Sequence, residues 1–335
     1  MTSERAGTAL EPSDKTAWPW WSNEVWDRVS FTWDLWYGCN YRCSYCWWEM
    51  DNLWAELAKK HRILPPEQWL ACWDRIYDLY GTTRVDVLGG EPLRYPSWKQ
   101  LFEGLSRRHR VSITTNLSVS MADLREMTDR VSPERIHFAA SYHPQFAKWN
   151  DFIEKIGFLK ERGYFPHVLV VAWPPLLKDL ARWSDFFRQA DVPFTTSVFQ
   201  GRYEGREYPE SYTTDQRALL GLNIPIAEEQ RYRLERQSTQ GKLCGAGHVY
   251  ANIKGNGDVY RCGQDCLGGA KPLGNIFDVG FGLHKAPAPC PYKHCSCGEF
   301  AFLWEDWTRK KGRLEFAVAN SLRRQEAQTR EARHG

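Results

Sequence analysis

The chain has 335 residues, 42% of them hydrophobic and 25% charged. This composition is typical of a globular protein and excludes disordered, collagen-like and coiled-coil classes. The formal net charge is +3, and the pI of 8.3 is below the value of about 9 that marks nucleic-acid-binding domains. Residues 1–15 contain no apolar export segment, and no run of about 18 apolar residues occurs. We therefore expect a cytoplasmic protein with no membrane or nucleic-acid partner.

Strand-like and helix-like segments alternate between residues 29 and 200. Strands are predicted at 29–36, 84–88, 110–114, 135–140, 167–172 and 194–199, and helices at 66–80, 98–107, 121–129, 146–160 and 178–189. One helix shows its apolar stripe clearly, at Phe146, Trp149, Ile153, Ile156 and Leu159. The alternation predicts an α/β fold in which a parallel sheet with right-handed crossovers forms an open or closed barrel. Its chemistry is expected at the carboxyl ends of the strands.

The alternation stops after residue 200. Residues 201–243 are predicted to be a connection, and residues 244–308 a small Cys-rich domain of hairpin and loops. Gly and Asn residues at 255–257 predict a hairpin between strands at 249–253 and 259–261. Residues 309–335 are predicted to form a basic helix, and residues 1–28 an N-terminal extension. The chain is therefore expected to contain a barrel at residues 29–200 and smaller units before and after it.

Ten cysteines are present, and they are clustered. Cys39, Cys43 and Cys46 lie in one short window directly after the first predicted strand. In a chain without an export signal, clustered cysteines indicate metal ligands because the cytosol keeps thiols reduced. Three thiolates can hold three irons of a cubane cluster and leave the fourth iron open. A closed zinc site would require a fourth protein ligand.

This cysteine spacing, with Tyr45 before the last cysteine, resembles the CxxxCxΦC motif of the radical SAM superfamily. The second predicted strand ends in Gly89, Gly90, Glu91 and Pro92, similar to the GGEP turn with which that family binds the amino group of S-adenosylmethionine (SAM). Two glycines allow a close backbone approach, and a carboxylate can pair with an ammonium group.

Two further strand ends resemble the family more weakly. The third ends in Thr114, Thr115 and Asn116, similar to the TTN segment beside the cofactor, and the fourth ends at Ser141, where the family places a contact to SAM. The resemblance covers residues 29 to about 200. It implies a partial (β/α)6 barrel with a 4Fe-4S cluster, SAM, and a flavodoxin- or ferredoxin-type reductant. His137 and His143 lie near strand ends, but a lone histidine is more often structural than catalytic.

The activity that the resemblance implies is reductive cleavage of SAM to a 5'-deoxyadenosyl radical, which removes hydrogen from a C–H bond. No general-base pair is needed to begin that reaction, and no specific acid/base or nucleophile pattern occurs in the sequence.

A second group of cysteines follows. Cys244, Gly257 and Cys262 have the CX9-15GX4C spacing that opens the SPASM and twitch extensions of radical SAM enzymes, which hold an auxiliary 4Fe-4S cluster. The other cysteines of this group are Cys266, Cys290, Cys295 and Cys297. Six thiols fill one four-ligand cluster and not two. Cys244 and Cys262 are the first choice as ligands, with the others from Cys290, Cys295 and Cys297.

Cys266 is then the spare thiol and a candidate hydrogen donor in an epimerase. A zinc ribbon is the alternative for the whole module. The expected substrate is a natural product, either sugar-like or a peptide, and the expected reaction is dehydrogenation or epimerisation, with oxidation favoured. The alternatives are a maturase of ribosomally made peptides (RiPPs) that crosslinks or epimerises them, and a non-catalytic, zinc-stabilised binding protein. The latter would use the tryptophans, of which 17 occur in the chain.

Overall fold

A computed structural model describes residues 29–47, 59, 61–224, 230–295 and 302–303. Its centre is a run of six parallel strands, paired in chain order. They are β1 (Ser30–Trp36), β2 (Arg84–Gly89), β3 (Arg110–Thr115), β4 (Ile136–Ser141), β5 (His167–Val171) and β6 (Phe194–Ser197). The connecting helices are α4 (Pro66–Tyr80), α5 (Trp98–Ser106), α6 (Met121–Arg130), α7 (Trp149–Glu161) and α8 (Leu180–Gln189). The predicted alternation of strands and helices is confirmed.

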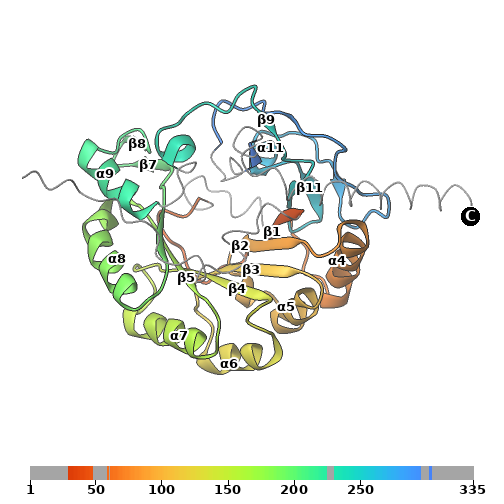
Figure 1. The fold of residues 1–335 in the computed structure, drawn as a ribbon, viewed down its shortest axis with the longest axis horizontal. Helices are drawn as coiled ribbons and strands as arrows, with labels where there is room; N and C mark the ends of the chain where they lie inside the picture. Colours follow the sequence, from red (N-terminus) through yellow and green to blue (C-terminus); the bar gives the residue numbers. More distant parts are fainter. Residues whose placement is uncertain (1–28, 48–58, 60, 225–229, 296–301, 304–335) are drawn as a thin grey trace, which may run out of the picture.

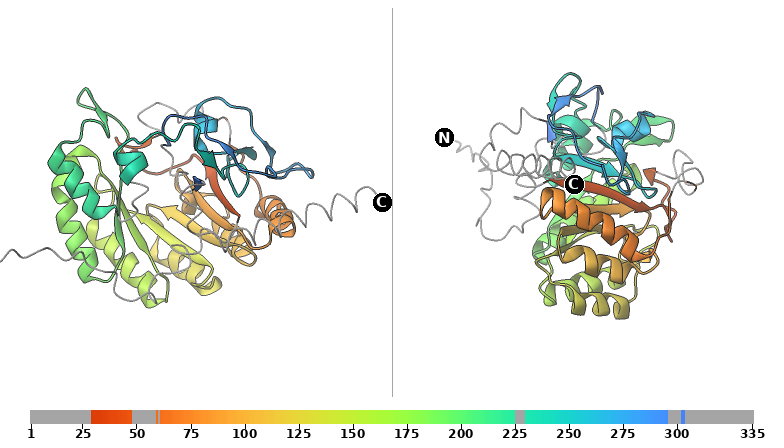
Figure 2. Two further views of the ribbon diagram at one scale, coloured as in Figure 1. Left: turned by 45° about the horizontal axis from the view of Figure 1, so that its top comes forward. Right: turned by 90° about the vertical axis from the view of Figure 1, so that its right-hand side faces the viewer.

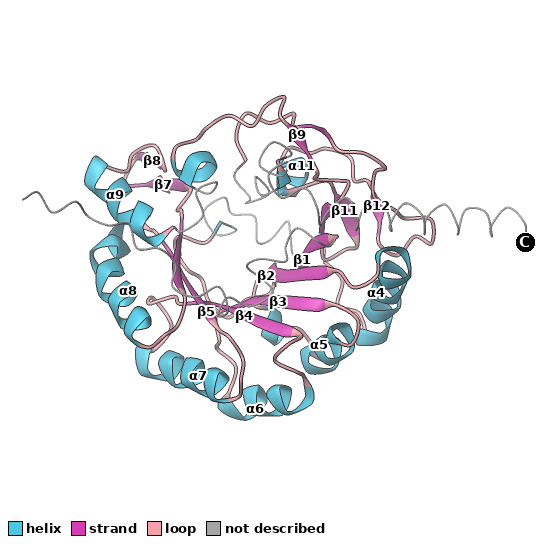
Figure 3. Ribbon diagram, viewed as in Figure 1, coloured by secondary structure: helices cyan, strands magenta, loops and turns pink. Residues whose placement is uncertain are grey.

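The helices cover the convex face of the curved sheet, and the strands line its inner side (Figures 1 and 3). Alternate residues of β1 show why. Phe31, Trp33 and Leu35 are fully buried, and the ring of Trp33 lies 4.8 Å from Trp69 and 5.3 Å from Trp73 of α4. These tryptophans therefore pack the layer between sheet and helices, which is the ordinary role of large aromatic side chains.

The sheet continues beyond β1 with strands from the C-terminal half of the chain. β10 (Tyr250–Ile253) pairs parallel with β1, β11 (Asp258–Tyr260) pairs antiparallel with β10, and β12 (Gly274–Asn275) forms the edge. Within the described residues β6 and β12 are the two edges of the sheet, so the barrel is open. Figure 2 shows these cyan and blue elements beside β1.

The predicted hairpin is thus confirmed, but its place in the barrel sheet is a finding of the structure. A buried ion pair supports the junction: the Lys254 ammonium lies 2.5 Å from the Asp34 carboxylate. The short elements of the C-terminal half are β7 (Gly201–Tyr203), β8 (Arg206–Tyr208), α9 (Thr214–Asn223), η3 (Gln230–Leu234), β9 (Leu243–Cys244), α11 (Gly263–Leu267) and β13 (Ala288–Pro289). The N-terminal extension 1–28 and the predicted basic helix 309–335 lie outside the described residues.

One detail of the predicted helix 146–160 is wrong. Helix α7 begins at Trp149, after Lys148 in extended conformation. Phe146 lies in the preceding turn, where its amide donates to the His143 carbonyl. Phe146 is 44% exposed, so it does not belong to the buried stripe.

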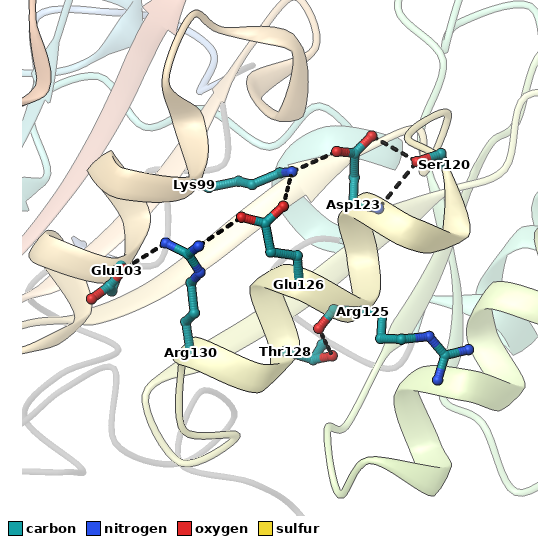
Figure 4. A network of polar contacts seen from close by, with 8 residues as sticks. All are labelled: Lys99, Glu103, Ser120, Asp123, Arg125, Glu126, Thr128 and Arg130. Carbon is teal, nitrogen blue, oxygen red and sulfur yellow. Dashed lines mark hydrogen bonds and ion pairs between the residues drawn. The ribbon is translucent and has the colours of Figure 1, made fainter.

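Two outer helices are joined by an ion-pair network (Figure 4). The Lys99 ammonium of α5 lies 2.5 Å from both Asp123 and Glu126 of α6. Arg130 of α6 in turn pairs with Glu126 at 2.8 Å and with Glu103 of α5 at 3.6 Å. A network of this kind fixes the two helices relative to each other more firmly than an isolated surface pair does. Within the described residues, no helix is both long and apolar enough to cross a membrane.

Candidate active site

A cavity of about 400 Å³ lies at the carboxyl ends of the six parallel strands, as the fold predicts. It brings together most of the predicted site residues. Its lining includes Cys39, Tyr41, Cys43, Tyr45, Cys46, Trp47, Gly89, Gly90, Glu91, Thr115, Asn116, Ser141, His143, Ser197, Gln200 and Arg233. Residues that follow five of the strands along the chain thus meet at one place.

The two glycines after β2 have a structural task beside the predicted approach to a ligand. Gly89 has a φ of +128°, and a Cβ atom there would lie 2.2 Å from the Trp36 carbonyl oxygen. A Cβ on Gly90 would lie 2.1 Å from the Gly38 carbonyl oxygen. The backbones are joined by hydrogen bonds of 2.8 Å from Gly90 N to Trp36 O and from Glu91 N to Gly38 O. The glycines therefore let β2 hold the loop that carries the cysteines.

The three cysteine thiols line this cavity from one loop and form no disulfide. The Tyr41 amide donates to Cys39 Sγ at 3.4 Å, and the Cys46 amide donates to the Cys43 carbonyl at 2.8 Å. Burial, followed by the neighbouring thiols of Cys46 and Cys39, raises the pKa of Cys43 to about 12. Three thiolates in this cavity would therefore repel one another, and a cationic group would be needed to hold them deprotonated.

The chemistry of the three thiols fits an iron–sulfur cluster. They line one cavity from a single loop. Iron–sulfur clusters take one thiolate on each of several irons. The donor set of Cys39, Cys43 and Cys46 is of that kind.

Glu91 is buried beside the cysteines, with 1% of its surface exposed. Its Oε1 accepts hydrogen bonds from Leu93 N at 3.0 Å and Thr115 Oγ1 at 2.7 Å, and its Oε2 accepts from Asn116 N at 2.6 Å. Burial raises the pKa of this carboxyl to about 7, although the three donors oppose the shift. Because each carboxylate oxygen can accept two hydrogen bonds, Oε2 keeps one acceptor position.

The carboxylate therefore joins the ends of β2 and β3, which the sequence did not predict. The Asn116 amide extends this connection to the cysteine loop, since its Nδ2 donates to Asn40 Oδ1 at 3.2 Å. Pro92 begins the short 3-10 helix Pro92–Arg94 and is not among the lining residues.

Tyr45, Ser141 and His143 line the next part of the cavity. The Tyr45 hydroxyl lies 3.1 Å from His143 Nδ1, and the two rings are stacked at 5.8 Å. Burial lowers the pKa of His143 to about 4, so its imidazole is neutral near pH 7. His137 is not among the cavity residues; its Nδ1 lies 2.9 Å from Ser112 Oγ.

Sequence reasoning missed the far side of the cavity. Ser197 and Gln200 belong to the end of β6, a position that the barrel interpretation could have assigned. Arg233 lies in the segment Gln230–Leu234 within the long connection, and no sequence pattern marked it. The cavity thus receives a guanidinium group from outside the barrel.

A second, smaller cavity of about 20 Å³ collects four of the C-terminal cysteines. Cys244, Cys262, Cys290 and Cys295 line it. Pairing of β9 with β13 brings Cys244 opposite Ala288, two residues before Cys290. Four thiols from three parts of the chain match the number of ligands that a 4Fe-4S cluster or a zinc ion takes.

Cys266 is not among the residues that line this smaller cavity. It lies in α11 near Tyr37 and Tyr260, where burial raises the pKa of both tyrosines and Cys266 adds a smaller contribution. Cys297 is outside the described residues.

The family comparison agrees with this geometry. Residues 33–174 match the model of the Radical SAM superfamily. This part of the chain is similar to a radical SAM domain. The matched range contains the three cysteines, the glycine turn with Glu91, and His143.

Similar solved structures extend beyond this range. SuiB from Streptococcus suis is 17% identical with a TM-score of 0.55, over 75% of this chain and 64% of SuiB. The chain thus covers less than two thirds of SuiB. The structure of anSMEcpe with bound AdoMet is 16% identical with a TM-score of 0.55, over 74% of this chain and 78% of that protein. At such identities the similarity is one of fold. No curated protein matches the sequence significantly.

Proposed function

We propose that the protein is a radical SAM enzyme that cleaves SAM reductively and abstracts hydrogen from a C–H bond of a natural-product substrate. The observation that carries this proposal is the cavity in which Cys39, Cys43 and Cys46 meet the buried carboxylate of Glu91. The cluster, when bound, supplies the electron that breaks the sulfonium bond. The protein positions the cofactor and excludes water.

Different side chains of the cavity would contact different parts of SAM. Glu91 Oε2 offers its remaining acceptor position to the ammonium group of the methionyl moiety. Thr115 and Asn116 hold that carboxylate in place through the hydrogen bonds described above. Tyr45 and Ser141 are the proposed contacts further along the cavity, where the neutral ring of His143 fixes the Tyr45 hydroxyl.

The second cysteine group is proposed to hold one auxiliary 4Fe-4S cluster. Its support is the convergence of Cys244, Cys262, Cys290 and Cys295 on one small cavity. Cys266 stands outside that set and keeps the role of candidate hydrogen donor. Under this assignment the predicted twitch-like unit supplies four thiols without Cys297.

The substrate is proposed to be a peptide or a sugar-like compound. The anSMEcpe structure with bound AdoMet and Cp18Cys peptide is 17% identical with a TM-score of 0.52, over 74% of this chain and 77% of that protein. This similarity supports a peptide maturase among the alternatives. A dehydrogenase would pass an electron from the substrate radical to the auxiliary cluster, whereas an epimerase would return a hydrogen atom from a thiol.

Anaerobic purification and metal analysis test the proposal. Two clusters correspond to about eight irons per chain and a brown protein. Cys43→Ala should lose about half of the iron, and Cys262→Ser the other half. A colourless wild-type protein that contains zinc and no iron would contradict the proposal and support the non-catalytic binding protein.

A further inference from the structure

One arginine joins the chain segments that meet at the smaller cavity. Arg261 follows β11 directly, precedes Cys262, and is among the residues that line this cavity. Its Nε donates to the Ala246 carbonyl at 3.0 Å. Its Nη1 and Nη2 donate to the carbonyls of Pro289 and Ala288, at 3.0 and 2.9 Å. Three of the five N–H donors of an arginine therefore bind backbone carbonyls here.

These hydrogen bonds connect the three parts of the chain that carry the four cysteines. Ala246 lies two residues after Cys244, and Pro289 immediately precedes Cys290. Arg261 itself is adjacent to the third cysteine-bearing position. A single guanidinium group therefore ties β9 and β13 to the end of β11, and with them it sets the spacing of the thiols.

The turn after β9 leaves room for this side chain. Gly247 has a φ of +86°, and a Cβ atom there would lie 3.0 Å from Arg261 Cγ. Such a separation is tighter than nine in ten real Cβ contacts, so an alanine would push the arginine stem by a few tenths of an ångström. The absence of a side chain at Gly247 therefore helps to keep the guanidinium where it binds.

The guanidinium also brings a permanent positive charge to the thiols. Its three acceptors are backbone carbonyls, which carry no net charge and do not neutralise it. Burial raises the pKa of the Cys244 thiol, whereas the Ala246 amide and the Arg261 guanidinium lower it. The potential of an iron–sulfur cluster depends on nearby charges and hydrogen bonds. A cation stabilises the reduced cluster more strongly than the oxidised one, because the reduced cluster carries one more negative charge.

We propose that Arg261 is a positioning residue of the auxiliary cluster, which holds the cysteine-bearing segments together and raises the reduction potential of the cluster through its charge. A raised potential suits the cluster to oxidise a substrate radical, which loses one electron to the oxidised cluster and one proton to water. Arg261 therefore favours dehydrogenation over epimerisation. This inference rests on the proposed function, because it requires a 4Fe-4S cluster at Cys244, Cys262, Cys290 and Cys295.

The test uses the full chain with Cys43→Ala, in which the auxiliary cluster holds the only expected iron, about four atoms per chain. A redox titration followed by electron paramagnetic resonance measures its midpoint potential. Arg261→Gln removes the charge and should lower the ratio of reduced to oxidised cluster about tenfold, a fall of about 59 mV for one electron. Arg261→Lys keeps the charge but not the planar fork, so its potential should stay near that of the parent. Both variants should lose iron to a chelator several-fold faster than the parent.

A pair of glycine variants displaces Arg261 without replacing it. Gly247→Ala pushes the arginine stem, whereas Gly269→Ala introduces similar backbone strain, at a φ of +71°, with no atom within 4 Å of the new Cβ. Gly247→Ala should therefore lose iron to the chelator several-fold faster than Gly269→Ala. Lys285→Gln removes an exposed cation from the same part of the chain, and it should change neither the potential nor the rate of iron loss.

An unchanged potential in Arg261→Gln would overturn the proposal, as would an equal fall of the potential in Arg261→Lys and Arg261→Gln. If Arg261→Gln retains no cluster, the glycine pair decides, and equal rates of iron loss in Gly247→Ala and Gly269→Ala would overturn the proposal. A Cys43→Ala protein that contains no iron, before any change at Arg261, would instead remove the proposed auxiliary cluster itself.

Discussion

Gly90→Ala tests how the glycine turn supports the cysteine loop. The new methyl group would lie 2.1 Å from the Gly38 carbonyl oxygen, whereas real Cβ atoms essentially never approach closer than 3.0 Å. The two backbones must therefore separate by about 1 Å. That movement weakens the 2.8 Å bonds from Gly90 N and Glu91 N. Overpacking together with two weakened hydrogen bonds amounts to a loss of stability on the order of 3 kcal/mol.

The separation also shifts Gly38, which immediately precedes Cys39. We therefore expect Gly90→Ala to lower both the free energy of unfolding in urea and the iron retained at the first cluster. Gly157→Ala is the matched control, since a Cβ at that position in α7 has no neighbour within 4 Å. It should stabilise the protein by about 0.5–1 kcal/mol. A Gly90→Ala protein with wild-type stability and iron content would refute this account of the turn.

Other substitutions separate binding, chemistry and assembly. Glu91→Ala should reduce SAM affinity by about one to two orders of magnitude with iron content unchanged; unaltered affinity would remove Glu91 from the site. Because the pKa of Glu91 is raised to about 7, this carboxyl should be almost fully ionised above pH 8. SAM affinity, measured by calorimetry, should therefore fall several-fold from pH 7 to pH 6. Cys266→Ala should keep all iron and should stop turnover only if the enzyme is an epimerase. In D2O, a wild-type epimerase would place one solvent deuterium in the product. A fully active Cys266→Ala variant rules out Cys266 as the hydrogen donor. Lys254→Met should lower the unfolding free energy by about 3–5 kcal/mol, since Asp34 would stay buried without its cation. If the Lys254→Met variant unfolds at the same urea concentration as the wild type, this ion pair does not hold the hairpin to the barrel.

The sequence predicted the barrel well because its signals are local. The alternation of predicted strands and helices and the apolar stripe of α7 each indicate an element from residues close together in the chain. Phe146 shows the limit of the same argument: it continues the periodicity of α7 by spacing, yet the chain turns at His143 to Ala147 and the helix starts later. Periodicity alone does not locate the first residue of a helix.

Pairings between distant segments could not be predicted. The parallel pairing of β10 with β1 joins residues more than 200 positions apart in the chain, and nothing in either strand specifies its neighbour. The cysteine motif and Glu91 were found because their spacing is characteristic. Arg233 was missed because its position depends on how the long connection folds back over the cavity.

The most direct test of the account is the formation of 5'-deoxyadenosine from SAM by the reconstituted protein under dithionite, measured by chromatography without oxygen. The wild-type chain should produce it, and Cys43→Ala should produce none, since one thiolate of the set that holds the cluster is missing. Cleavage of SAM by Cys43→Ala at the wild-type rate would contradict the assignment of Cys39, Cys43 and Cys46 as the ligands of the radical cluster.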